Sequence, residues 1–80
     1  MARQSTVMET TTGGTTRAFF KVIPDTNTRS WTLVQNGRVI RRMDSKSALV
    51  TEARRIARNR GNSVLEIRRS NGTFGSYSQY

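Results

Sequence analysis

Arginine is the residue type in this sequence with the clearest chemical potential. The chain has 14 lysines and arginines against five aspartates and glutamates, which gives a formal net charge of +9 and a pI of about 11.7. Twelve of the 14 cations are arginine, whose planar guanidinium group suits phosphates and the edges of bases. Such a field attracts polyanions. The composition therefore favours contact with nucleic acid, although a GC-rich genome would also favour arginine over lysine.

The residue types that most enzymes use in catalysis are absent or scattered. The sequence has no cysteine and no histidine, which excludes a cysteine nucleophile, a thiolate zinc site and the commonest general base. Beyond the N-terminal segment the carboxylates are Asp25, Asp44, Glu52 and Glu66, and no two are spaced as an acid–base pair. The sequence also lacks a P-loop and a nucleophile elbow. We therefore expect a protein that is not an enzyme, with no catalytic residue, cofactor or metal.

The stretch EARRIARNRG, residues 52–61, holds four arginines in ten positions. It belongs to a predicted helix, which Asp44 or Ser45 can cap at its start and Gly61 can end. At helical periodicity the apolar residues fall on one stripe, formed by Leu49, Ala53, Ile56 and Ala57. The opposite side presents three arginines, which are Arg54, Arg55 and Arg58. These three are the first candidate nucleic-acid-binding site, and the alternative is an ordinary solvated helix face.

Three strands are predicted before this helix. Residues 18–24, AFFKVIP, are β-branched and aromatic and end at a proline. Residues 31–35 and 38–43 form a hairpin around Asn36 and Gly37, a pair typical of a type I′ turn. After the helix, residues 63–69 predict a fourth strand, and residues 73–77 are either a short fifth strand or a tail.

The order β-β-β-α-β predicts a two-layer α+β domain over residues 18–80, with an antiparallel sheet and one helix on one of its faces. Alternation places six side chains toward the helix, namely Phe20, Val22, Trp31, Leu33, Leu65 and Ile67. The third strand is ambiguous, because Val39 and Met43 share a face with Arg41, whereas Ile40 shares one with Arg38 and Arg42. We expect Val39 and Met43 to point inward.

The sheet face without a helix is the second candidate nucleic-acid-binding site. Lys21, Arg68 and either Arg41 or the pair Arg38 and Arg42 project there, with Arg69 close by. A sheet face of this kind can enter the major groove of DNA, and the alternative is the polar side of an amphipathic sheet. Tyr77 and Tyr80 are further candidates for stacking on bases.

The N-terminal segment differs from the rest of the chain. Residues 1–17 are rich in threonine and poor in large apolar side chains, so we expect a disordered tail. No apolar run is long enough for a membrane span or a signal peptide. The sequence is therefore typical of a cytoplasmic protein without a membrane partner.

Several short motifs together resemble a known family. The runs FFKVIP, WTLVQNGR, SKSALVTEARRIARNRG and VLEIRRSNG, with a C-terminal SY, are similar to a small prokaryotic family catalogued as domain of unknown function 2188. The resemblance covers about residues 19–80, and the sequence departs from it where TRSW replaces a glycine before the tryptophan. It implies a fold but no activity.

The leading hypothesis is a small nucleic-acid-binding module for double-stranded DNA that makes mainly phosphate contacts. The alternative is a module for protein interaction or assembly, either with an acidic protein or as a homodimer through an exposed edge strand.

Overall fold

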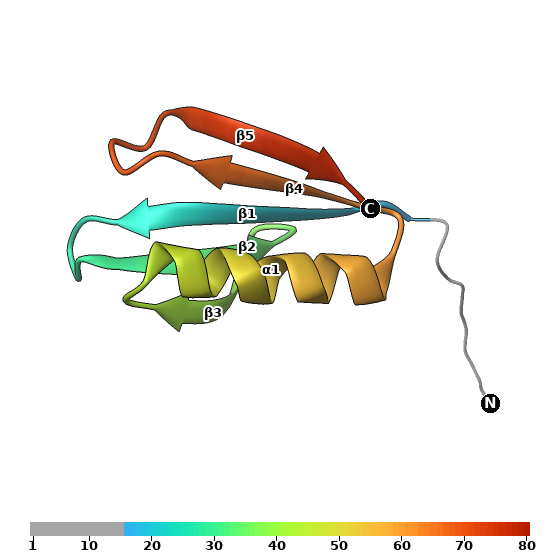
Figure 1. The fold of residues 1–80 in the computed structure, drawn as a ribbon, viewed down its shortest axis with the longest axis horizontal. Helices are drawn as coiled ribbons and strands as arrows, with labels where there is room; N and C mark the ends of the chain where they lie inside the picture. The colour runs from blue at the N-terminus through green and yellow to red at the C-terminus, as the bar shows by residue number, and fades with distance from the viewer. Residues whose placement is uncertain (1–15) are drawn as a thin grey trace.

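The computed structural model describes residues 16–80 and contains one five-stranded sheet with one helix across one face (Figure 1). The elements are β1 (Ala18–Asp25), β2 (Ser30–Gln35), β3 (Arg38–Met43), α1 (Lys46–Arg60), β4 (Ser63–Arg68) and β5 (Phe74–Gln79). The predicted α+β class is confirmed, and the run after residue 73 is a fifth strand. Apart from residues 16 and 17, the predicted N-terminal tail lies outside the described residues.

The sheet is mixed, so the predicted antiparallel sheet was wrong at one pair of strands. The strand order is β3-β2-β1-β4-β5. Three neighbouring pairs are antiparallel, and β1 pairs with β4 in parallel. The reason is the crossover: β1 and β3 run in the same direction on either side of β2, and the helix that follows β3 returns the chain so that β4 runs that way too.

The core lies between α1 and the sheet. All six side chains that were predicted to point toward the helix belong to it, and Phe20, Val22, Leu33 and Leu65 are at most 1% exposed. Trp31 is partly buried and packs against the same cluster. The helix contributes its predicted stripe, in which Leu49, Ala53 and Ala57 are buried and Ile56 packs against them.

The expectation for the third strand was partly wrong. Val39 is 53% exposed, while Ile40 and Met43 pack against the core. The cause is a register shift between β2 and β3, where Leu33 pairs with Arg41 but Val34 pairs with Val39. Ile40 is therefore the extra residue of a β-bulge, and a bulge lets consecutive side chains depart from simple alternation.

The helix ends and the hairpin turn follow the predicted local chemistry. The Ser45 hydroxyl accepts a hydrogen bond from the backbone N–H of Ala48 at 3.2 Å, so Ser45 rather than Asp44 is the N-cap. At the other end the N–H of Gly61 donates to the carbonyl of Ala57. Asn36 and Gly37 both have positive φ angles, +50° and +87°, as a type I′ turn requires.

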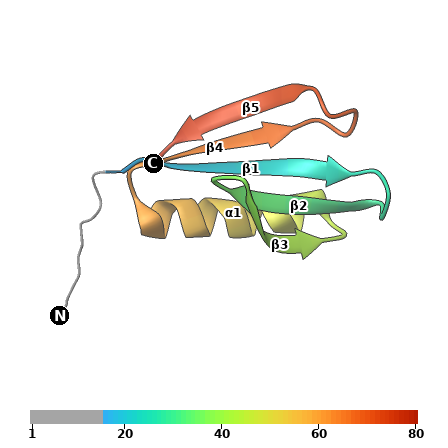
Figure 2. The same cartoon turned by 180° about the vertical axis from the view of Figure 1, so that it is seen from behind.

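The helix does not cover the whole sheet. It contacts β1, β2, β3 and β4, but not β5. The edge strand β5 therefore extends beyond the helix layer (Figures 1 and 2). Within residues 16–80 no helix is long and apolar enough to cross a membrane.

Candidate nucleic-acid interface

The fold divides the predicted cationic residues between two surfaces. We call the surface that carries α1 the helix side and the opposite surface of the sheet the sheet face. The sheet face is turned toward the viewer in Figure 2. Strand register and helical position place Arg38, Arg41, Arg54, Arg55 and Arg58 on the helix side. The same register places Lys21, Arg42 and Arg68 on the sheet face, and Arg69 lies in the turn after β4.

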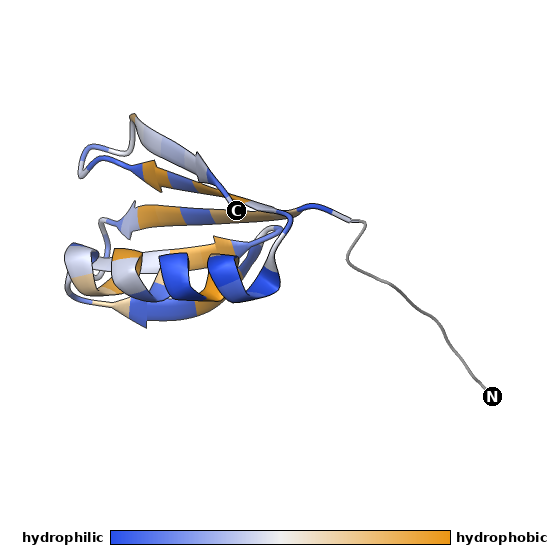
Figure 3. Cartoon of the chain, turned by 45° about the vertical axis from the view of Figure 1, so that its right-hand side comes forward, coloured by the Kyte–Doolittle hydropathy of each residue, from blue (hydrophilic) through white to orange (hydrophobic). Residues whose placement is uncertain are grey.

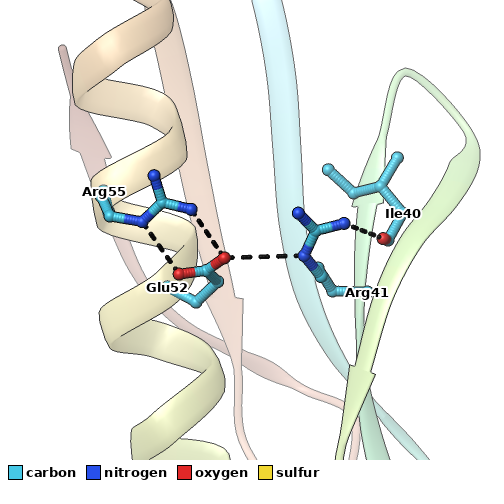
Figure 4. A network of polar contacts seen from close by, with 4 residues as sticks. All are labelled: Ile40, Arg41, Glu52 and Arg55. Carbon is cyan, nitrogen blue, oxygen red and sulfur yellow. Dashed lines mark hydrogen bonds and ion pairs between the residues drawn. The ribbon is translucent and has the colours of Figure 1, made fainter.

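On the helix side, one carboxylate binds two of the predicted arginines (Figure 4). Glu52 accepts two hydrogen bonds from Arg55, at 2.7 and 3.0 Å, and lies 3.6 Å from the Nε of Arg41. The hydrogen bonds from Arg55 lower the pKa of Glu52, and the same contact raises the pKa of Arg55. The charge of these two arginines is therefore partly neutralised within the protein.

Arg54 and Arg58 are two arginines of α1 that no carboxylate of the described residues binds. Both are exposed, and neither forms an ion pair with any residue in the described part of the chain. They offer charge alone, since the four large apolar side chains that are highly exposed lie elsewhere.

The carboxylates of the sheet face are also bound by arginines. Asp25 lies 3.6 Å from Arg42. Glu66 accepts a hydrogen bond from the Nε of Arg68, whose Nη1 also donates to the carbonyl of Gly72 at 3.0 Å. Neither carboxylate is left to oppose an approaching anion.

Lys21 lies at the centre of the sheet face, on the middle strand of the sheet. Its neighbours in register are Val34 on β2 and Glu66 on β4. No ion pair of Lys21 occurs within residues 16–80. Next to it is a groove at the hairpin end of the sheet, lined by Arg17, Phe19, Lys21, Val34, Asn36 and Gly37. We call this the Phe19 groove.

The wall of the Phe19 groove is held by the hairpin turn. The Oδ1 of Asn36 accepts the backbone N–H of Phe19 at 2.9 Å, and the N–H of Asn36 donates to the carbonyl of Phe19, also at 2.9 Å. These reciprocal bonds fix the turn against β1. Phe19 is 53% exposed although its N–H and its carbonyl are both hydrogen-bonded to Asn36.

The large apolar side chains with high exposure gather on the sheet face. Phe19, Val39, Phe74 and Tyr77 are each more than half exposed, and strand register places all four on this face. Tyr77 is exposed and stays a candidate for stacking, whereas Tyr80 packs against the core and is only partly exposed. The sheet face thus combines unpaired cations with exposed rings.

Arg17 and Phe19 were not predicted as candidate site residues. Arg17 was assigned to the N-terminal tail, and Phe19 was given no role. The signal was present in the alternation of the first strand, because Phe20 and Val22 point to the core and residues 17, 19 and 21 must then share the opposite face.

Among residues 16–80, no three or more acidic side chains lie close enough together to hold a metal ion. In comparisons with known proteins, no family model, no curated protein and no solved structure matches this chain. The resemblance of residues 19–80 to domain of unknown function 2188 therefore stays a prediction.

Proposed function

We propose that this protein is a non-catalytic nucleic-acid-binding module and that the sheet face is its principal contact surface. The observation that carries the proposal is the position of Lys21 and Arg17, which form no ion pair within residues 16–80, beside the exposed ring of Phe19. Lysine and arginine bind phosphate, and exposed rings stack on bases.

The sheet face is a better candidate than the helix side for one reason. Both surfaces carry cations without an ion pair to a described residue, Lys21 and Arg17 on the sheet face and Arg54 and Arg58 on the helix side. The sheet face also carries highly exposed aromatic rings and a groove lined by its cations, which the arginines of α1 lack. Arg54 and Arg58 then add to long-range attraction of the nucleic acid, within a Debye length of about 8 Å at physiological salt.

The test is fluorescence anisotropy with a labelled duplex and a labelled single strand of about 16 nucleotides, the upper end of one small site. Binding is expected at micromolar protein in about 50 mM salt and should weaken steeply as salt rises. The discriminating pair of variants is Lys21→Glu and Arg54→Glu, because each lowers the net charge by two.

We expect Lys21→Glu to weaken binding of at least one of the two probes much more than Arg54→Glu does. Absence of binding to both probes at low salt would reject the proposal. A larger loss for Arg54→Glu would instead assign the contact surface to the helix side.

A second candidate function, assembly through β5, is favoured by one specific observation. The two edges of the sheet differ: β3 carries Arg38, Arg41 and Arg42, whereas the sequence of β5, FGSYSQ, has no charge and no proline. Figure 3 shows most of β5 in pale shades between hydrophilic and hydrophobic. Charged side chains protect an edge against pairing, and an uncharged edge is open to another strand.

The main-chain pattern suggests a sharp test of assembly. Ser63 and Tyr80 exchange two backbone hydrogen bonds, at 3.0 and 2.8 Å. Along an antiparallel edge strand, residues whose backbone N–H and carbonyl bond to the neighbouring strand alternate with residues whose N–H and carbonyl point outward. Because Tyr80 bonds to β4, the N–H of the preceding residue, Gln79, points away from β4. Gln79→Pro should remove an outward donor without disturbing the sheet, and Gln79→Ala is the matched control that keeps it.

Light scattering in high salt gives the readout for these two variants. A homodimer of the unaltered protein and of Gln79→Ala, but a monomer of Gln79→Pro, is the expected result if two copies pair through β5. A monomer in all three cases would eliminate this candidate.

A further inference from the structure

The start of β1 and the residue before it present two cations and one ring along a single line. Arg17, Phe19 and Lys21 alternate with the buried Ala18 and Phe20. At about 3.3 Å per residue, Arg17 and Lys21 are separated by about 13 Å along the strand, with Phe19 midway between them. A single aromatic ring is therefore flanked on both sides by phosphate-binding groups.

The other residues that line the Phe19 groove are partly apolar and partly polar. Val34, the neighbour of Lys21 on β2, supplies an aliphatic surface. Gly37 leaves open space beside it. Asn36 also lines the groove, and because its Oδ1 is bound to the N–H of Phe19, its amide nitrogen is the end of the side chain that can donate to a ligand. The groove thus combines a ring, an aliphatic surface and a polar side chain.

We propose that the Phe19 groove binds one unpaired nucleotide of a single-stranded nucleic acid. The base stacks on Phe19 and contacts Val34, the phosphates on its two sides lie at Lys21 and Arg17, and the amide of Asn36 donates to the edge of the base. This inference rests on the proposed function and narrows it, because it assigns single strands rather than duplexes as the preferred class.

The groove is expected to prefer single strands because the Phe19 ring must reach the face of a base. In a duplex the faces of the bases are stacked on one another, so an aromatic side chain can lie against them only after a base step is unstacked, which costs free energy. Unpaired bases expose their faces and stack on aromatic side chains regardless of sequence. The phosphate contacts alone would bind single strands and duplexes alike. A preference for single strands therefore depends on the ring of Phe19.

The experiment measures the anisotropy of labelled oligothymidylate, labelled oligouridylate and a DNA duplex with the same number of phosphates. The variants are Phe19→Ala and Phe74→Ala, since the two rings are 53% and 57% exposed on the same face but only Phe19 lines the groove. Trp31 lies on the helix side and packs against the core, so its fluorescence reports whether each variant is folded.

We expect the unaltered protein to bind both single strands more tightly than the duplex. Phe19→Ala should weaken single-strand binding between about five-fold and about one-hundred-fold, as loss of one stacked base does, and should leave duplex binding almost unchanged. Phe74→Ala should have a much smaller effect. Amide chemical shifts on adding oligothymidylate should move at residues 17–21 and 34–37, and not at residues 54–58.

Three results would overturn the inference. Equal affinity for single strands and duplex, with equal effects of the two variants, would show that the groove holds no base while the proposed function stands. Binding of oligouridylate alone would show that a ribose hydroxyl, absent from the assignment above, decides recognition. If none of the three probes binds, the proposed function fails and this inference fails with it.

Discussion

At the scale of single residues, Glu52 decides how much of the arginine-rich helix is available to a partner. Its carboxylate binds Arg55 through two hydrogen bonds and attracts Arg41 across the gap to β3. Arg55 and Arg54 are adjacent in sequence, yet within residues 16–80 only Arg55 forms an ion pair. The density of arginine in EARRIARNRG therefore overstates the charge that the helix presents.

The pH dependence of folding stability should report the Glu52 contact. Hydrogen bonds from Arg55 lower the pKa of Glu52 below its ordinary value of 4.5. The ionised carboxylate therefore stabilises the folded state fully above the unfolded pKa, and this contribution is lost as the pH falls through the lower folded pKa. The measurement is the urea midpoint between pH 6 and pH 3.

Glu52→Gln should be less stable than the unaltered protein at pH 6, and the difference should shrink toward zero at the acidic end. Arg54→Gln, which removes a charge from the same helix without breaking an ion pair with a described residue, should leave this pH dependence unchanged. A deficit for Glu52→Gln that is the same at every pH would contradict the assignment.

At the scale of elements, α1 depends on its first turn because its packing stripe is narrow. Only Leu49, Ala53 and Ala57 are fully buried along its 15 residues. Two of these are alanines, so the apolar area that holds the helix to the sheet is small. The cap at Ser45 should therefore matter more here than in a helix with a larger buried face.

Loss of the cap can be measured directly. Ser45→Ala removes the acceptor for the N–H of Ala48 and should lower the free energy of unfolding by about 1 kcal/mol, within a range of about 0.5 to 2 kcal/mol. Ser45→Asp keeps an acceptor at the same position and should retain most of the stability. Equal losses in the two variants, measured by urea unfolding, would show that the hydroxyl is not the cap.

At the scale of the whole molecule, the net charge of +9 and the local arrangement of charge have different consequences. The total field attracts polyanions to every side of so small a protein. Only cations that touch phosphates release counterions and set the salt dependence of affinity. The two lysines offer a clean comparison, because Lys21 lies on the sheet face and Lys46 lies over the Trp31 ring, 4.9 Å from its centroid, on the helix side.

The salt dependence of binding should separate contact from attraction. Lys21→Gln is expected to reduce the slope of log K against log salt by about 0.7 for a single strand or about 0.9 for a duplex, the value for one phosphate contact. Lys46→Gln has the same net charge as Lys21→Gln and should leave the slope unchanged. Equal changes in the two variants would mean that the sheet face has no special role.

Much of the fold could be predicted because local patterns determine it. The Asn36–Gly37 turn, the apolar stripe of α1 and the inward alternation of Phe20 and Leu65 follow from residues that are neighbours in sequence. The inward residues of β3 could not be predicted, because a bulge changes which side chains face the core and its position depends on pairing with β2. The parallel pairing of β1 with β4 likewise depends on where the crossover places the returning strand.

The candidate site divides in the same way. The sequence by itself determined the surplus of cations, the lack of histidine and cysteine, and the presence of a sheet with one face free of helix. Only the tertiary structure decided which cations meet carboxylates, since Arg41 reaches Glu52 and Arg42 reaches Asp25 from distant parts of the chain. It also decided that Asn36 closes against Phe19 to form a groove. Ion pairs and grooves depend on side chains brought together through space, and local sequence patterns carry no information about those distances.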